Sequence, residues 1–222
     1  MSRPRLLDLF SGAGGAAVGY HRAGFDVVGI DIAPQPSFPF AFIQADALNP
    51  PVRLEDFDLI HASPPCQKHV AGLAAANTAL GRTLDHADLI GPTRDMLRAS
   101  GRPYIIENVE GAPLLAPVRL CATSFGLPMY RHRLFESNVL LMGRECEHDR
   151  QREAKYWTSW RPNGEVRRAK VVQVYGQAAE RHLWAEAMDI DWMTPDEMTQ
   201  AIPPAYTEWL GRQMLPLLME AA

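Results

Sequence analysis

One cysteine in this chain stands where the backbone would present its thiol to a ligand. Cys66 follows two prolines in the run Ser63-Pro64-Pro65-Cys66-Gln67, directly after the apolar segment 58–62. Because proline fixes φ, the two prolines hold one backbone conformation ahead of the thiol. A cysteine nucleophile needs such presentation and a lowered pKa. The pattern favours a nucleophilic Cys66 over a buried structural cysteine, the commoner fate of a lone thiol.

Three charged residues could assist that nucleophile. Glu107 ends an apolar segment, so its carboxyl would lie beside the cysteine turn if the two segments are neighbouring strands. A surface acid or a helix cap is the alternative for this residue. Arg131 and Arg133 are separated by one residue, which places both on the same side of an extended segment. They could hold a phosphate or stabilise a thiolate.

A glycine loop supplies a candidate cofactor site. Gly12-x-Gly14-x-x-Ala17 follows an apolar segment, and Asp31 ends the next one. Glycines in such a loop let a cofactor approach the backbone, and an acidic residue at the end of the following strand can bind ribose hydroxyls. The loop alone fits a dinucleotide, another nucleoside cofactor or a tight structural turn.

These residues fall at the ends of predicted strands. Apolar runs predict strands at 5–10, 25–32, 42–46, 58–62 and 103–109. Helical patterns follow at 15–23, 88–100, 184–193, 195–200 and 205–219. The alternation predicts an α/β fold, a doubly wound and mostly parallel sheet of the Rossmann-like kind. Ligands bind such sheets at the carboxyl ends of the strands, where the candidate residues lie.

Composition and charge limit the class of protein. The chain has 222 residues and three cysteines, which fits one main core in a reducing compartment, with no apolar run of membrane-spanning length. Seven basic and two acidic residues give the segment Arg150–Lys170 a charge of +5; because the whole chain carries −4, the remainder carries −9. Tyr156, Trp157 and Trp160 interrupt the basic residues. Such a segment can bind phosphates and stack on bases, or it can be a solvated surface.

Four segments, in this order, resemble successive motifs of the cytosine-C5 DNA methyltransferase family: residues 8–15, 64–67, 107–109 and 131–133. Residues 200–206 with Leu210-Gly211 resemble the last motif of that family. The resemblance implies an S-adenosylmethionine-dependent methyltransferase fold, DNA as substrate and base flipping, because the target base must leave the duplex for attack. The expected activity is that of a DNA (cytosine-5-)-methyltransferase.

The resemblance also implies a role for each matching residue. Cys66 would attack C6 of cytosine so that C5 takes the methyl group, and Glu107 would hydrogen-bond N3 and the exocyclic amine. Arg131 and Arg133 would anchor the site near the thiolate and the flipped nucleotide. The S-adenosylmethionine pocket would be formed by Phe10, Gly12, Ala13, Gly14, Gly15, Asp31 at the ribose, Ile32, Asp46 at the adenine amino group, Ala47, Pro64 and Gln200. Gln67, in a matching motif, would contact DNA. The charge of the basic segment, and not the resemblance, adds Arg150, Arg152, Arg167 and Arg168 as candidate phosphate contacts.

The chain departs from the family pattern at three places. His69 and Val70 stand where the family commonly has an aromatic residue and a serine, and Gln200 stands where it often has asparagine. The longer amide at Gln200 could keep a hydrogen bond or reshape the pocket, so a donor altered near the sulfonium stays an alternative to a methyl donor. The stretch between Arg133 and Gln200 is short for a target-recognition region.

These departures leave several alternatives open. An RNA cytosine-C5 methyltransferase and a catalytically silent DNA-binding homologue that needs a partner are the two rivals; a dehydrogenase would have no use for Cys66 on its proline turn. We expect a catalytic core at 1–137, a small recognition lobe at 138–195 and a segment returning to the core at 196–222. The expected location is the cytoplasm of a bacterial or phage-infected cell. The target sequence, the oligomeric state and a restriction-linked, solitary or viral role stay open.

The remaining cysteines allow a second kind of site. Cys121, Cys146 and His148 could supply three zinc ligands, and His132 could complete a set of four. The spacing is not that of a standard zinc finger, so we expect core cysteines, a surface histidine and no metal, with zinc as the alternative.

Overall fold

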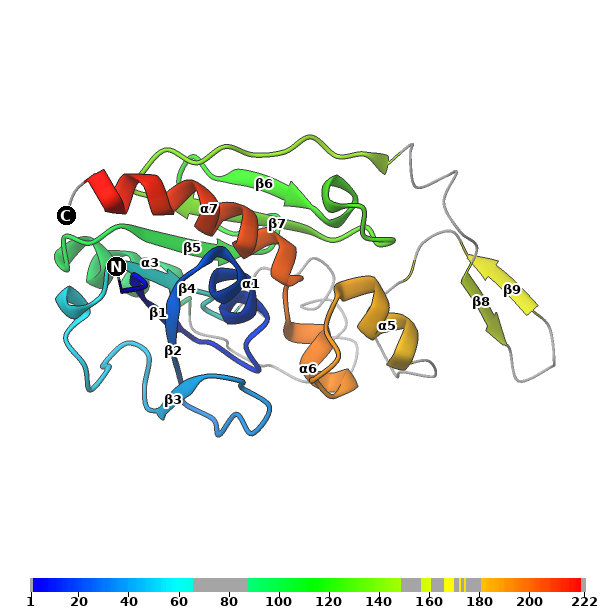
Figure 1. The fold of residues 1–222 in the computed structure, drawn as a ribbon, viewed down its shortest axis with the longest axis horizontal. Coiled ribbons are helices and arrows are strands. Elements are labelled where there is room, and N and C mark those ends of the chain that lie inside the picture. Colours follow the sequence, from blue (N-terminus) through cyan, green and yellow to red (C-terminus); the bar gives the residue numbers. More distant parts are fainter. Residues whose placement is uncertain are drawn as a thin grey trace.

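The structure is a computed structural model that describes residues 2–65, 88–148, 157–160, 166–169, 172, 174 and 181–220. Its centre is a seven-stranded sheet in the order β3-β2-β1-β4-β5-β7-β6 (Figure 1). The strands are β1 Arg5–Leu9, β2 Asp26–Asp31, β3 Ala41–Gln44, β4 Leu59–Ala62, β5 Tyr104–Asn108, β6 Val118–Cys121 and β7 His132–Ser137. A separate two-stranded sheet pairs β8 Trp157–Trp160 with β9 Val166–Ala169.

Helices connect and cover the strands. They are α1 Gly15–Ala23, α3 Ile90–Ala99, α5 Arg181–Met188, α6 Pro195–Gln200 and α7 Pro204–Glu220, with 3₁₀ turns η1 Leu54–Asp56 and η2 Ala122–Phe125. Strands β1 to β5 pair in parallel, whereas β7 is antiparallel to both β5 and β6. The predicted α/β fold with a doubly wound, mostly parallel sheet is therefore confirmed.

The strand order places a crevice beside β1. The chain runs from β1 outward to β2 and β3, then returns to form β4 on the other side of β1. This reversal is a topological switch point, where loops leave in opposite directions and open a crevice at the carboxyl ends of the strands. The glycine loop after β1 and the Ser63-Pro64-Pro65 turn after β4 both lie at this point.

Alternating side chains of each strand build a core on both faces of the sheet. Leu6 belongs to the core cluster that includes residues of α1, α5 and α7, while Leu7 belongs to a second cluster that includes residues of α3 and η1. Figure 1 shows α7 running beside α1 on the first face. The approach is close because Gly19 has no side chain; a Cβ there would lie 2.0 Å from Oγ1 of Thr207. That hydroxyl donates a 2.8 Å hydrogen bond to the carbonyl of Ala16.

Most elements begin and end within a few residues of the sequence prediction, and two larger differences stand out. Helix α5 ends at Met188, before the predicted 193, because Asp189 adopts a left-handed backbone with φ 57°. The strands β6 and β7 were not predicted, since β7 reads His-Arg-Leu-Phe-Glu-Ser and has only two buried residues, so the apolar pattern is weak. Among the described residues, no helix is long and apolar enough to cross a membrane.

Candidate active site

A cavity of about 460 Å³ opens at the crevice beside β1. Its walls come from the carboxyl ends of β1, β2, β4 and β5, from the start of β7 and from the end of α6. Its lining residues include Asp8, Phe10, Gly12, Ala13, Gly15, Asp31, Ile32, Ser63, Pro64, Pro65, Glu107, Arg133, Gln200, Ala201 and Ile202.

The loop after β1 turns sharply at the cavity. Phe10 has a φ of 56° and Gly12 a φ of 48°, so a non-glycine residue is held in the left-handed region at the cavity wall. Such strained backbone persists only where surrounding contacts impose it, and it clusters at functional sites. The Asp31 carboxylate imposes the turn by accepting hydrogen bonds from the backbone amides of Gly12 and Ala33, each 3.0 Å long. A Cβ on Gly12 would meet no atom within 4 Å, so the loop borders open space.

The segment after α6 closes the same cavity from the C-terminal side. A Cβ on Gly15 would lie 2.5 Å from the carbonyl oxygen of Ile202, so only glycine allows this segment to approach the loop. The indole Nε1 of Trp192 donates a 2.9 Å hydrogen bond to the carbonyl of Ala13. Together these contacts bring Gln200 to the wall of the cavity, 185 residues along the chain from Gly15.

Asp8 is a buried carboxyl that sequence reasoning did not assign to the site. Its side chain lies within β1, is 0% exposed and lines the cavity, and neither carboxyl oxygen has a hydrogen-bond partner among the residues that the structure describes. Burial raises the pKa of Asp8 well above its ordinary value, and the nearby charges of Asp31 and Glu107 raise it further. A ligand donor or cation would satisfy these oxygens.

Glu107 and Arg133 form an ion pair at the cavity wall. Because β7 is antiparallel to β5, Asn108 faces Leu134 in register, and the Nε of Arg133 lies 3.0 Å from the Oε1 of Glu107. Burial raises the pKa of Glu107, although Arg133, a hydrogen bond with Ser63 and Arg131 oppose this effect. The carboxyl therefore keeps its proton at higher pH than an ordinary glutamate and can donate a hydrogen bond as well as accept one.

The turn that leads to Cys66 is tied to β5. The side-chain amide of Asn108 donates a 2.9 Å hydrogen bond to the carbonyl of Pro64. In the motif Glu107-Asn108, one side chain thus faces the cavity while the next holds the proline turn against its neighbouring strand. This bond explains how two motifs 40 residues apart form one wall.

A buried hydrogen-bond chain supports the same turn. His61 Nε2 and Ser63 Oγ are 2.9 Å apart, and His61 Nδ1 and the hydroxyl of Tyr20 are 3.0 Å apart. Burial lowers the pKa of His61 to about 3, so the imidazole is neutral and its two nitrogens divide the roles of donor and acceptor. This series of hydrogen bonds connects Tyr20 of α1, through His61 of β4, to Ser63, which in turn hydrogen-bonds Glu107.

The predicted site residues are gathered only in part. Cavity-lining positions are occupied by Phe10, Gly12, Ala13, Gly15, Asp31, Ile32, Pro64, Glu107, Arg133 and Gln200, whereas Gly14, Asp46, Ala47 and Arg131 do not line the cavity. The carboxylate of Asp46 is exposed and accepts hydrogen bonds from Leu48 N at 2.9 Å and Asn49 Nδ2 at 2.8 Å. The guanidinium of Arg131 donates to the carbonyls of Thr199 and Ala201, which holds the segment before Ile202.

The remaining predicted residues either lie outside the described part of the chain or do not line the cavity. Cys66, Gln67, Arg150 and Arg152 lie outside the described residues, although Pro65, the residue before Cys66, lines the cavity. Arg167 and Arg168 are consecutive residues of β9. The three candidate metal ligands Cys121, Cys146 and His148 lie together with His132.

Sequence reasoning missed Asp8, His61 and Tyr20. Signals for the first two were present, because each is a polar residue inside an apolar strand, and such residues are buried only where they have partners or a function. Tyr20 carried no such signal, since an aromatic residue on a helix is ordinary core.

Similar proteins were found by sequence and by structure. Over 166 residues the chain is 30% identical to the type II methyltransferase M.HgiDI of Herpetosiphon aurantiacus, a match covering 59% of this chain and 50% of that protein. The chain thus spans about half the length of this relative. No profile of a known protein family matches the chain.

Two solved structures share the whole architecture. The methyltransferase EhMeth of Entamoeba histolytica superposes with a TM-score of 0.56 at 11% identity, covering 100% of both chains. The Dnmt2 methyltransferase of S. pombe superposes with a TM-score of 0.54 at 15% identity, covering 99% of both chains. The chain therefore has the doubly wound, Rossmann-like fold of these methyltransferases.

Proposed function

We propose that this protein transfers a methyl group from S-adenosylmethionine to C5 of cytosine in DNA, with Cys66 as the nucleophile. One observation carries the proposal: the Glu107–Arg133 pair, with its 3.0 Å separation, faces the same cavity as the glycine loop and the proline turn that ends at Cys66. The groups proposed to recognise the base, to bind the cofactor and to lead to the nucleophile thus line one cavity. The similarity to a type II methyltransferase supports the same class of reaction.

The cavity fits S-adenosylmethionine by its chemistry. The cofactor carries a sulfonium and an α-ammonium group, and the carboxyl oxygens of Asp8, which have no hydrogen-bond partner in the described part of the chain, are suited to such cations. Asp31 has each oxygen engaged by one backbone amide, which leaves lone pairs for the ribose hydroxyls. Ile32, 73% exposed at the wall, offers an apolar surface to the adenine. Bound there, the cofactor supplies an electrophilic methyl group.

Each bond made in this reaction is balanced by one broken. The thiolate of Cys66 adds to C6, forming the S–C6 bond and opening the C5–C6 double bond. Glu107 holds N3 and the exocyclic amine, and its retained proton stabilises the negative charge that develops on the ring. C5 takes the methyl group as the sulfonium carbon–sulfur bond breaks to a neutral thioether. Loss of the C5 proton to a base then restores the double bond and expels the thiolate.

The first experiment identifies the acceptor and the modified atom together. The full chain is incubated with labelled S-adenosylmethionine and either mixed-sequence DNA or transfer RNA, followed by mass spectrometry of the nucleosides. We expect 5-methylcytosine from DNA. Label confined to RNA would replace DNA by the RNA alternative, and cofactor binding without transfer would favour the silent homologue. Nucleosides from cells that express the protein test the donor, since a group larger than methyl on C5 would there indicate an altered donor.

The second experiment tests the nucleophile. DNA containing 5-fluorocytosine should trap a covalent protein–DNA adduct, because fluorine cannot leave C5 as a proton does. Cys66→Ser should abolish the adduct while its S-adenosylmethionine affinity, measured by calorimetry, stays close to that of the wild type. An adduct that persists in Cys66→Ser would show that another residue attacks the base.

A further inference from the structure

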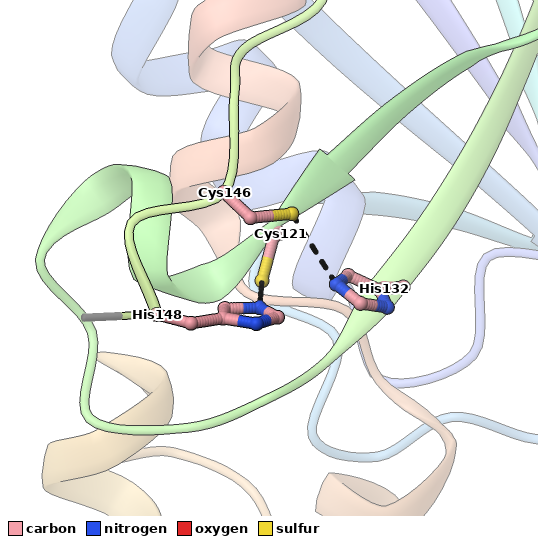
Figure 2. A group of neighbouring side chains, drawn as sticks. All are labelled: Cys121, His132, Cys146 and His148. Carbon is pink, nitrogen blue, oxygen red and sulfur yellow. Dashed lines mark hydrogen bonds between the residues drawn. The ribbon is translucent and has the colours of Figure 1, made fainter. Parts of the chain in front are cut away.

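Four metal-ligating side chains meet at the edge of the sheet, outside the cavity. Figure 2 shows them pointing toward one another from three segments: the end of β6, the start of β7 and the chain after β7. One ligand atom from each lies within 4.8 Å of the others, the sole such cluster of three or more metal-ligating groups among the described residues. The four are Cys121, His132, Cys146 and His148.

The separations match the edges of a tetrahedral zinc site. The Sγ of Cys121 is 3.3 Å from the Nε2 of His148, and the Sγ of Cys146 is 3.4 Å from the Nε2 of His132. Zinc bonds of about 2.3 Å to sulfur and about 2.05 Å to nitrogen give a sulfur–nitrogen edge of about 3.5 Å. All four ligand atoms lie within 4.8 Å of one another, so no pair exceeds the sulfur–sulfur edge of about 3.8 Å by more than about 1 Å, which small side-chain rotations can close.

Two residues outside the cluster hydrogen-bond its side chains in the way that is usual around a bound metal. His132 has its Nε2 directed at the cluster, and its Nδ1 lies 3.1 Å from the carboxylate of Glu110. A ligating histidine almost always donates its second ring N–H to a carboxylate, carbonyl or water, which fixes the tautomer and the ring orientation. Thr123 Oγ1 lies 3.2 Å from the Sγ of Cys121 and can donate to it. Both contacts hold ligand atoms in place before any metal binds.

We propose a structural zinc site with the ligands Cys121, His132, Cys146 and His148. Two thiolates and two neutral imidazoles complete a tetrahedral set of protein ligands, which is the composition of a closed structural site. The two thiol protons pass to solvent on binding, so the thiolate charges balance the charge of Zn²⁺. This proposal does not depend on the methyltransferase activity.

The position of the site gives it a mechanical role. Cys121 and His132 are register partners across β6 and β7, so the metal would cross-link two strands that are already paired. Cys146 and His148 belong to the chain that follows β7 and precedes the basic segment Arg150–Lys170. The zinc ion therefore ties the start of that segment to the strand that carries Arg133.

Metal content tests the proposal directly. The full chain, purified without added chelator, should contain one zinc ion per protein by inductively coupled plasma mass spectrometry. Cys146→Ser should lose it, whereas Cys66→Ser, which also removes one thiol, should keep it. Wild-type protein that stays metal-free after reconstitution with zinc, or that contains a Cys121–Cys146 disulfide instead, would overturn the proposal; so would Cys146→Ser with full zinc content.

Two further measurements test the site without removing a metal ligand. They are the spectrum of the cobalt-substituted protein and the zinc affinity of a variant at Glu110, which contacts His132. Protein loaded with Co²⁺ should show the intense visible absorption of a tetrahedral centre and a thiolate-to-cobalt charge-transfer band. Glu110→Gln should raise the dissociation constant for zinc roughly 10- to 100-fold in competition with a chromophoric chelator. Glu145→Gln, which neutralises an exposed carboxylate beside Cys146, should leave it unchanged. An octahedral cobalt spectrum, or equal affinities in the two variants, would contradict this ligand set.

Discussion

Five carboxyl groups line the cavity, and the three that strands contribute, Asp8, Asp31 and Glu107, each have a different environment. Asp8 has no hydrogen-bond partner among the described residues, Asp31 accepts two backbone amides, and Glu107 faces a guanidinium. Environment determines the charge and hence the role of a carboxyl group. Asp31 is suited to accept hydrogen bonds from hydroxyl groups, and Asp8 is suited to bind a cation. Glu107 is suited to donate a hydrogen bond to a nucleobase from its protonated form.

We predict that Asp8→Asn weakens S-adenosylmethionine binding about tenfold, because a bound cation would hold Asp8 in its ionised form against the effect of burial, and a hydrogen bond to a charged group contributes roughly 1.5–3 kcal/mol. Asparagine keeps the size of the side chain but not its charge. Asp26→Asn is the matched control, because Asp26 is exposed at the opposite end of the sheet, where β2 begins. Isothermal titration calorimetry gives both affinities, and equal values for the two variants would remove Asp8 from the cofactor site.

The raised pKa of Glu107 predicts a pH effect on catalysis. Because burial raises this pKa, the protonated form that donates to the base is lost as pH rises through the folded-state value. The second-order rate constant kcat/KM should therefore fall on the alkaline side, where Cys66 is increasingly ionised and would otherwise raise the rate. Glu107→Gln should lower kcat/KM by roughly 10²-fold or more and abolish this alkaline fall. An alkaline fall that survives in Glu107→Gln would assign it to another group.

The same shift acts on stability with a defined sign. The folded protein binds the Glu107 proton more tightly than the unfolded chain, so this group contributes less to stability as pH rises from the ordinary carboxyl range through the folded-state pKa. Glu136 has the opposite sign: burial alone would raise its pKa, but the hydrogen bonds and charge of Arg94 lower it overall, so its contribution is lost as pH falls.

Between elements, one buried ion pair fixes α3 against β7. The guanidinium of Arg94 donates from Nε and Nη2 to the two carboxylate oxygens of Glu136, each at 2.7 Å, and Nη2 also donates to the carbonyl of Pro113 at 2.8 Å. The Glu136 side chain is 2% exposed. Because β7 pairs with β5, this contact positions the strand that presents Arg133 beside Glu107.

Breaking that pair should be costly. Arg94→Ala leaves a buried carboxylate without its cation, and we expect a loss of about 3–5 kcal/mol in the free energy of unfolding. Arg53→Ala is the control: Arg53 is 77% exposed and 3.8 Å from Glu55, so its removal should change stability by less than about 1 kcal/mol. Urea denaturation followed by circular dichroism measures both. Similar losses in the free energy of unfolding would show that the buried Arg94–Glu136 pair contributes no more to stability than the exposed Arg53–Glu55 pair.

Across the whole molecule, charge is distributed unevenly. The segment Arg150–Lys170 carries +5 within a chain of net charge −4. A protein that is acidic elsewhere repels phosphates over most of its surface, so a basic segment would direct DNA to one part of it.

We predict that DNA affinity depends on where the basic charge lies. Arg167→Glu with Arg168→Glu should weaken DNA binding and make the logarithmic dependence of affinity on salt less steep by about two units, because two phosphate contacts are lost. Arg3→Glu with Arg53→Glu changes the net charge equally outside the basic segment and should have the smaller effect. Fluorescence anisotropy over a series of salt concentrations compares the pairs. If both pairs weaken binding alike, only the net charge matters.

The order of the motifs and the apolar periodicity determined much of this protein from sequence. Strands β1, β2, β4 and β5 are local apolar runs ended by glycine, proline or polar residues, so their positions and the α/β class followed from pattern alone. The rule that ligands meet the carboxyl ends of such strands predicted that Gly12, Asp31, Pro64 and Glu107 share a site, and all four line the cavity.

Only the tertiary structure decided which side chains meet. In the sequence, Asp8 is one polar residue that interrupts an apolar strand. Only the tertiary structure shows that its carboxyl oxygens have no hydrogen-bond partner among the residues described. Asp46, predicted at the adenine, accepts hydrogen bonds from residues two and three positions further along and does not line the cavity. The cluster of two cysteines and two histidines has no recognisable spacing, since β6–β7 pairing, not chain proximity, brings Cys121 to His132. Local pattern thus determines elements, while contacts between distant segments depend on packing that no local pattern encodes.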